Sequence, residues 1–344
     1  MIDNNILIKG DNIKGLQWLL DNGYEGKIDL CYIDPPFATG GTFAKDNDGR
    51  VATISKSSNS KVAYTDTLQG PEFISFLKER AKLIHKLLSE KGSLYLHIDY
   101  KIGHYVKVML DEVFGMDNFR NDITRIKCNP KNFERVGYGN IKDMILFYSK
   151  GKNPIWNHPR IPCDEEDIIK LYNKIDKNGR RYTTVPIHAP GETKNGDSNK
   201  PFKGMLPPKG RHWRCSVEEL ERLDSEGLIE WSATGNPRKI NYADDHMTKK
   251  AQDIWEFKDP TRPIYPTEKN IDMLNFIIEA SSSPNSIVMD CFCGSGSTLL
   301  AAKMCGRKWI GIDQSDVAIE TTKKRFEERD LFTENNLQYE YHEV

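Results

Sequence analysis

One stretch near the C-terminus constrains the fold of this chain more than any other. Residues 287–290 form an apolar run typical of a buried strand, and a glycine-containing turn follows at 291–298. An apolar helix is predicted over 299–305, and 308–313 is a second strand that ends in Asp313. This order predicts the first βαβ unit of a Rossmann-type nucleotide site, in which Asp313 accepts hydrogen bonds from ribose hydroxyls.

The glycine spacing in this turn limits the class of nucleotide. A dinucleotide fingerprint requires a third glycine three residues after Gly296, and Leu299 stands there. The turn is therefore a poor cradle for a pyrophosphate. A nucleoside without phosphates remains as the ligand class, and S-adenosylmethionine is the candidate.

A second motif, Asp34-Pro35-Pro36-Phe37, ends an apolar run at 30–33 that predicts another short buried strand. Neither proline has an N–H group, so the Asp34 carboxylate and the Pro35 carbonyl are acceptors with few competing donors. Two converging acceptors suit a primary amine, and Phe37 offers a flat face to a planar base. The structural alternative is a Pro-Pro turn in which Asp34 caps its own backbone.

Together, the two motifs resemble a known family. The first is similar to the catalytic D-P-P-F/Y motif of S-adenosylmethionine-dependent DNA amino-methyltransferases, and 292–296 is similar to their F-x-G-x-G motif. The order, with the catalytic motif first, resembles the permuted β class of these enzymes. The resemblance covers nearly the whole chain except the middle, because further matches lie at 10–12, 94–99, 137–150 and 265–269.

The resemblance implies an α/β fold, a Rossmann-like doubly wound methyltransferase sheet, with Asp34, Pro35 and Phe37 as catalytic residues. It places Asp11 near the cofactor adenine, whereas capping of the following helix is the alternative role. Lys269 is expected to pair with the methionine carboxylate of the cofactor. The expected cofactor-binding residues are Asp11, Asn12, Asp34, Thr267, Lys269, Asp290, Phe292, Gly294, Gly296, Thr298, Asp313 and Gln314.

Charge and cysteine content exclude several classes of protein. The formal net charge of −1 excludes a uniformly basic DNA-coating protein, so any DNA-binding surface must be local. Seven cysteines without a C-x-x-C pair favour neither a disulfide framework nor a zinc site, and they fit a cytoplasmic protein without a bound metal. No run of about 18 apolar residues is present, so no membrane span is expected.

The composition changes at residue 151. Between 171 and 215 the chain has ten Lys or Arg residues against three Asp or Glu, with frequent aromatic residues, glycine and proline. Clustered positive charge on a near-neutral chain predicts contacts with DNA phosphates, and a solvated surface domain is the alternative. We expect a catalytic half at 1–150, an irregular target-recognition insert at 151–247 and a cofactor-binding half at 248–344. The expected DNA-binding residues are Lys174, Lys177, Arg180, Arg181, Lys203, Lys209, Arg211 and Arg214.

The resembling enzymes also indicate the target base. An aspartate at the head of the catalytic motif favours the N6 amine of adenine, whereas N4-cytosine enzymes more often carry serine there. A base inside a duplex cannot reach such a pocket, so the nucleotide must be flipped out. Cytosine C5 methylation needs a cysteine nucleophile, and Pro162-Cys163, the only Pro-Cys pair, has acidic neighbours that disfavour a thiolate.

The expected function is therefore site-specific N6-adenine methylation of double-stranded DNA. N4-cytosine methylation is the first alternative, and a catalytically idle DNA-binding subunit on the same fold is the second. The intact Asp34, Phe292, Gly294, Gly296 and Asp313 argue against an idle subunit. The protein partners to test are a second copy of the chain and a cognate restriction endonuclease.

Overall fold

The computed structural model describes residues 4–36, 42–45, 51–52, 61–65, 70–130, 134, 136–192, 196–245, 248–261, 263, 265, 268–330 and 339–344. The chain divides into two compact units. Unit 1 consists of Met1–Pro159 and Gln252–Val344, and unit 2 consists of Arg160–Ala251.

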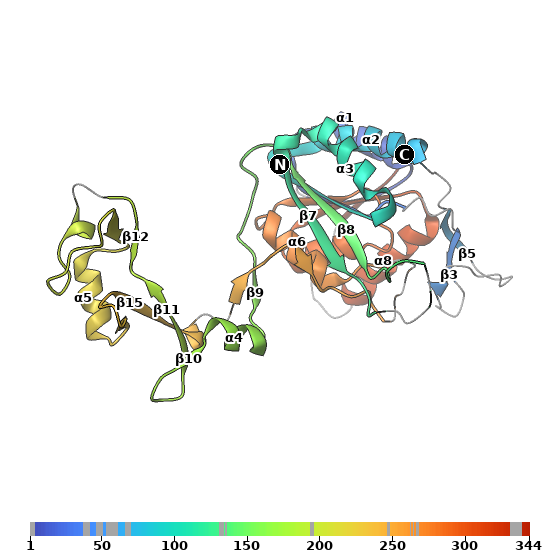
Figure 1. Cartoon of the computed structure of the whole chain (residues 1–344). Helices are drawn as coiled ribbons and strands as arrows, with labels where there is room; N and C mark the ends of the chain where they lie inside the picture. Colours follow the sequence, from blue (N-terminus) through green and yellow to red (C-terminus); the bar gives the residue numbers. More distant parts are fainter. Residues whose placement is uncertain are drawn as a thin grey trace. The chain divides into compact units, whose positions relative to one another are not determined.

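A nine-stranded sheet forms the centre of unit 1 (Figure 1). Strand β8 runs antiparallel to both of its neighbours, and the other neighbouring pairs are parallel. Parallel strands present their carboxyl ends at one edge, which is where open α/β sheets bind ligands. The order is β17 (Ile254–Trp255), β7 (Phe119–Ile126), β8 (Lys142–Ser149), β6 (Leu88–Ile98), β2 (Ile28–Ile33), β18 (Ile287–Asp290), β19 (Lys308–Asp313), β1 (Asn5–Lys9) and β20 (Tyr339–Glu343).

Helices cover both faces of this sheet (Figure 1). The alternation along β1 shows the division, because Ile6 and Ile8 belong to one hydrophobic core and Leu7 belongs to the other. The predicted doubly wound α/β sheet is therefore confirmed. The helices on one face are α1 (Asn12–Asp21), α2 (Gly70–Leu87) and α3 (Tyr100–Phe114), and those on the other face are α6 (Ile271–Ser281), α7 (Ser297–Met304) and α8 (Asp316–Asp330).

The remaining elements of unit 1 are short. Strands β3 (Thr42–Lys45), β4 (Val51–Ala52) and β5 (Lys61–Thr65) form a separate antiparallel sheet, and the 3₁₀ turn η1 (Met116–Asn118) follows α3. Among the described residues, none of the helices has the length and apolar character that crossing a membrane requires.

Unit 2 contains short strands joined by long connections. Its small core is formed by Ile187, Phe202, Trp213 and Leu220. A four-stranded sheet has the order β10 (Lys174–Ile175), β11 (Arg181–Pro186), β15 (Pro237–Tyr242) and β14 (Ile229–Trp231). The other elements are the pair β9 (Arg160–Pro162) and β16 (Thr248–Lys250), the pair β12 (His188–Pro190) and β13 (Arg211–Trp213), the helices α4 (Glu165–Leu171) and α5 (Val217–Ser225), and the 3₁₀ turns η2 (Asp197–Asn199) and η3 (Ala243–Asp245).

Unit 2 starts at Arg160, later in the chain than the change in composition at residue 151. We expected the insert at 151–247, but 151–159 belongs to unit 1. The Ile155 N–H donates to the Lys91 carbonyl (3.0 Å), and the Asn157 side chain donates to two carbonyls next to the end of α6 (2.6 and 2.8 Å). These bonds tie a polar, loop-like segment to unit 1, and composition alone does not reveal them.

Candidate active site

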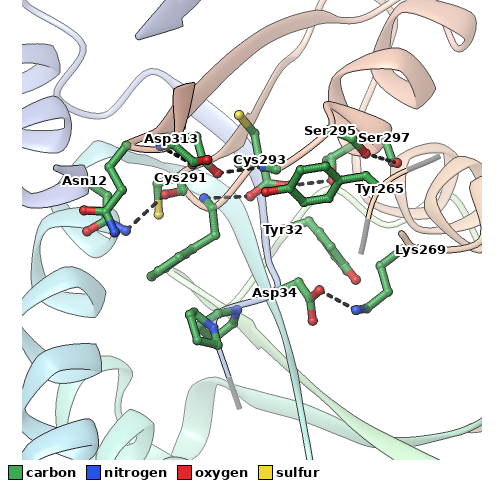
Figure 2. Close-up of a pocket in the computed structure, with 18 of the residues that line it drawn as sticks. Asn12, Tyr32, Asp34, Tyr265, Lys269, Cys291, Cys293, Ser295, Ser297 and Asp313 are labelled. Atoms are coloured by element: carbon green, nitrogen blue, oxygen red, sulfur yellow. Dashed lines mark hydrogen bonds and ion pairs between the residues drawn. The ribbon is translucent and has the colours of Figure 1, made fainter. Parts of the chain in front are cut away.

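A pocket of about 200 Å³ lies beyond the carboxyl ends of β1, β2, β18 and β19 (Figure 2). Asp34, which follows β2, and Gly294, which follows β18, both line it although they are far apart in the sequence. The pocket brings together most of the residues expected from sequence. These are Asp11, Asn12, Asp34, Pro35, Lys269, Asp290, Phe292, Gly294, Thr298, Asp313 and Gln314.

Three expected site residues are absent from the described lining of the pocket. Phe37 and Thr267 lie outside the described residues. Gly296 has a left-handed φ of 74°, and a Cβ atom there would lie 2.8 Å from Cγ2 of Thr322 on α8. Gly296 therefore allows the turn to pack closely against α8, and its expected place at the cofactor stays a prediction.

The glycine turn after β18 is held by the neighbouring strand β19. The Gly294 N–H donates to Oδ2 of Asp313 (2.9 Å), and the Ser315 N–H donates to Oδ1 of the same carboxylate (2.9 Å). Burial raises the pKa of Asp313 despite these bonds. Asp313 thus fixes the turn and also presents a carboxylate to the pocket.

Asp290 ends β18 beneath this turn and is buried. The Thr298 hydroxyl donates to its Oδ2 (2.6 Å), and the Phe292 N–H donates to its Oδ1 (3.0 Å). Burial raises the pKa of Asp290 to about 7, and the charges of Asp34 and Asp313 act in the same direction. A substantial fraction of Asp290 is therefore protonated at neutral pH.

A buried arginine organises the wall that follows β1. Asp11 caps α1, because its Oδ1 accepts a hydrogen bond from the Ile13 N–H (2.9 Å). Arg80 on α2 pairs with Oδ2 of Asp11 (3.4 Å) and donates from Nε to Oδ1 of Asn12 (2.5 Å). Its guanidinium carbon lies 3.4 Å from the centroid of the Phe76 ring. Capping by Asp11 is thus confirmed, and the same carboxylate lines the pocket.

Asp34 forms a buried ion pair on the opposite wall (Figure 2). Its Oδ2 pairs with the ammonium group of Lys269, and both side chains are largely buried. Its Oδ1 is buried and accepts no hydrogen bond from any residue in the described ranges. Lys269 was expected to bind the methionine carboxylate, but the structure places its ammonium group on Asp34. The free Oδ1 is an open acceptor, which suits an N–H donor.

Several lining residues were not identified from sequence. Arg80 lies three positions after Leu77, on the inward face of α2. A charge at such a position was the available signal, because arginine is rarely buried without partners. The other residues have no comparable signal in one sequence. They are Tyr32, Pro36, Phe76, Tyr265, Glu268, Cys291, Cys293, Ser295, Ser297 and Ser315.

The eight basic residues expected to bind DNA all lie in unit 2, but their surroundings differ. Three of them pair with carboxylates: Lys174 with Glu230, Arg180 with Asp244, and Lys203 with Asp224. The others have no carboxylate of the described chain within ion-pairing distance. These five are Lys177, Arg181, Lys209, Arg211 and Arg214.

Comparison with known proteins identifies the family of the chain. The family model described as DNA methylase matches residues 28–324, most of the chain. The chain belongs to this DNA methylase family. The type II methyltransferase M.EcaI of Enterobacter cloacae is 42% identical over 94% of this chain and 69% of its own length. The EcoPI Mod subunit of the type III restriction-modification enzyme of Escherichia phage P1 is 23% identical over 94% of this chain and 59% of its own length.

A solved DNA methylase structure has the same fold as this chain. The putative DNA modification methylase TTHA0409 from Thermus thermophilus, solved in complex with S-adenosyl-L-methionine, has a TM-score of 0.50, 13% sequence identity and 98% coverage of both chains.

In the described part of the chain, His, Cys, Asp and Glu side chains form no group of three or more that could hold a metal ion.

Proposed function

We propose that this DNA methyltransferase transfers a methyl group from S-adenosylmethionine to the exocyclic N6 amine of an adenine flipped out of duplex DNA. The observation that carries the proposal is the buried Oδ1 of Asp34, which has no hydrogen-bond partner among the described residues; Asp34 lines the same pocket as the glycine turn and Asp313. An amine N–H would satisfy this acceptor. The neighbouring Pro35 carbonyl would accept the second N–H of the amine.

The residues of the pocket fit a nucleoside cofactor without a pyrophosphate. Gly294 has a left-handed φ of 51° and lies beside the ring of Tyr265, because a Cβ there would be 3.5 Å from Cε1, an ordinary van der Waals distance. We assign Asp313 to the ribose hydroxyls and Asp11, oriented by Arg80, to the adenine amine of the cofactor. When bound, S-adenosylmethionine supplies a methyl group activated by its sulfonium.

The chain then contributes positioning and electrostatics. Hydrogen bonds to Asp34 and Pro35 would draw the target amine toward tetrahedral geometry and localise its lone pair for direct attack. No covalent enzyme intermediate is needed. We assign to Lys269 the role of holding Asp34 in place and balancing its charge, because its ammonium group pairs with Oδ2, while Oδ1 has no hydrogen-bond partner among the described residues.

We further propose that unit 2 recognises the target DNA. Its five basic residues that have no carboxylate partner in the described chain supply charge for phosphate contacts. The names of the relatives, a type II methyltransferase and a type III Mod subunit, support a cognate restriction endonuclease as a cellular partner. A second copy of the chain is the other partner to test, by sedimentation of the purified protein.

Nucleoside mass spectrometry tests the proposed reaction. The purified protein is incubated with isotopically labelled cofactor and mixed-sequence duplex DNA, and the DNA is digested to nucleosides. Labelled N6-methyladenine is the expected product. Labelled N4-methylcytosine would leave the pocket chemistry standing and overturn the proposed base. Cofactor binding without methyl transfer to any duplex would indicate an idle subunit.

A further inference from the structure

A row of hydrogen-bonded polar side chains runs sideways across the sheet from the pocket. It passes over the neighbouring strands β2, β6 and β8 and ends just beyond β7. The Tyr32 hydroxyl lies 2.9 Å from Nδ1 of His97, and Nε2 of His97 lies 3.2 Å from Oδ2 of Asp143. Lys127 donates to Oδ1 of Asp143 (2.6 Å), and Nη1 of Arg125 lies 3.6 Å from Oδ2.

The charges at the far end determine where the protons lie. Burial opposes ionisation of Asp143, but hydrogen bonds from His97 and Lys127 and the charge of Lys127 lower its pKa. Asp143 is therefore an acceptor, and Nε2 of His97 must carry the proton that it accepts. Burial lowers the pKa of His97, so the ring is neutral and Nδ1 has no proton. Nδ1 can then only accept a hydrogen bond from the Tyr32 hydroxyl.

This proton arrangement gives Tyr32 a defined character in the pocket. Burial raises the pKa of Tyr32 well above its ordinary value, so the hydroxyl keeps its single proton and donates it to His97. Tyr32 and Asp34 are two positions apart at the end of β2, and both line the pocket (Figure 2). Because its single hydrogen is donated to His97, the Tyr32 oxygen can act toward any further partner only as an acceptor.

We propose that the Tyr32 oxygen contacts the positively charged methyl-sulfonium group of S-adenosylmethionine, with His97 and Asp143 as positioning residues. The inference rests on the proposed use of this cofactor. The C–H groups next to a sulfonium are positively polarised, and they form C–H···O contacts with an oxygen that offers lone pairs. A hydroxyl free to rotate could instead present its hydrogen to the cation. The His97–Asp143 pair prevents that rotation.

Tyr95 shows what a hydroxyl with only a structural role looks like in the same sheet. It is the register partner of Tyr32 on β6, and it is equally buried. Its hydroxyl lies 2.7 Å from the Ser281 hydroxyl, and Tyr95 does not belong to the described lining of the pocket. Tyr95→Phe is therefore a matched control for Tyr32→Phe.

Calorimetric titration with two ligands tests the proposal without relying on activity. S-adenosylmethionine carries the sulfonium, and S-adenosylhomocysteine has a neutral thioether in its place. Tyr32→Phe should weaken binding of S-adenosylmethionine about fivefold, the effect of roughly one net hydrogen bond, and change binding of S-adenosylhomocysteine less than about twofold. Tyr95→Phe should leave the ratio of the two affinities unchanged.

Equal loss of affinity for both ligands in Tyr32→Phe, or no loss for either, would overturn the proposal. Nitrogen-15 NMR of the ligand-free protein provides an independent test, because it reports which ring nitrogen of His97 carries the proton. A cationic ring or a proton on Nδ1 at neutral pH would also overturn it. Failure of the wild-type protein to bind S-adenosylmethionine would instead refute the proposed function.

Discussion

Replacing Arg211 and Arg214 together by glutamine should weaken DNA binding and reduce its salt dependence. Both side chains are exposed, and neither lies within ion-pairing distance of a carboxylate in the described ranges. They converge on His188, since Arg211 donates to its Nδ1 (3.1 Å) and Arg214 to its carbonyl (3.3 Å). Burial and the charges of Arg211, Arg214 and Arg238 lower the pKa of His188, as expected where positive charge is concentrated.

The size of the effect follows from counterion release. Each phosphate contact contributes about 0.9 to the slope of log K against log salt, so losing two contacts should reduce the slope by about 1.8. At about 0.1 M salt the same loss corresponds to a decrease in affinity of about 60-fold. Fluorescence anisotropy with a labelled duplex, measured at several concentrations between about 50 and 200 mM salt, gives both quantities.

The control is a second double variant, Arg180→Gln with Lys203→Gln. These cations pair with Asp244 and Asp224, so their charges are already balanced within unit 2. We expect the slope of log K against log salt to change by less than about half as much as in the variant that lacks Arg211 and Arg214. Equal losses in both variants would refute the distinction between paired and unpaired cations. An unchanged slope in the first variant would move the DNA-binding surface away from His188.

Three further outcomes are expected in unit 1. Asp34→Ala should lower single-turnover methyl transfer at least about 100-fold while cofactor affinity, measured by calorimetry, changes only a few-fold; near-normal turnover would refute the assigned role. The pKa of Asp290 is about 7 in the folded protein against an ordinary 3.8, so the folded state favours the protonated form. The protonated form of Asp290 contributes about 4 kcal/mol to the free energy of unfolding; this contribution is complete below pH 3.8 and is lost as pH rises to about 7. Asp290→Asn should lack this pH dependence of stability in denaturant titrations, and parallel pH profiles of the variant and the wild type would contradict the reasoning. Gly296→Ala should destabilise by more than about 1 kcal/mol and by more than Gly306→Ala, because both have left-handed φ but a Cβ at Gly306 meets no atom within 4 Å; equal thermal shifts would contradict the packing role.

The C-terminal βαβ unit was predictable because local sequence determines it. The apolar runs at 287–290 and 308–313 coincide with β18 and β19, and α7 begins at Ser297, two residues before the predicted start. The earlier start follows from Gly296, whose left-handed conformation ends the turn. Apolar runs, glycines and strand-end acids are features that one sequence displays directly.

Interactions between distant segments were not predictable in this way. The basic stretch at 171–215 was read as a net positive surface, but the carboxylates that neutralise part of it come from later elements. Glu230 lies on β14, Asp224 on α5 and Asp244 in η3. A charge count within a window omits partners that only the fold brings close. The same limit explains why Tyr32 was missed at the pocket.

The different partners of the strand-end acids explain why Asp34 needs Lys269. Asp290 and Asp313 both accept hydrogen bonds from backbone N–H groups of the turns that follow them. Asp34 is followed by Pro35 and Pro36, which have no N–H to donate. A largely buried carboxylate without backbone donors requires a cation, and Lys269 supplies one to Oδ2. Among the described residues, Lys269 contacts only Oδ2 of this carboxylate and Oδ1 accepts no hydrogen bond, as the proposed binding of an amine requires.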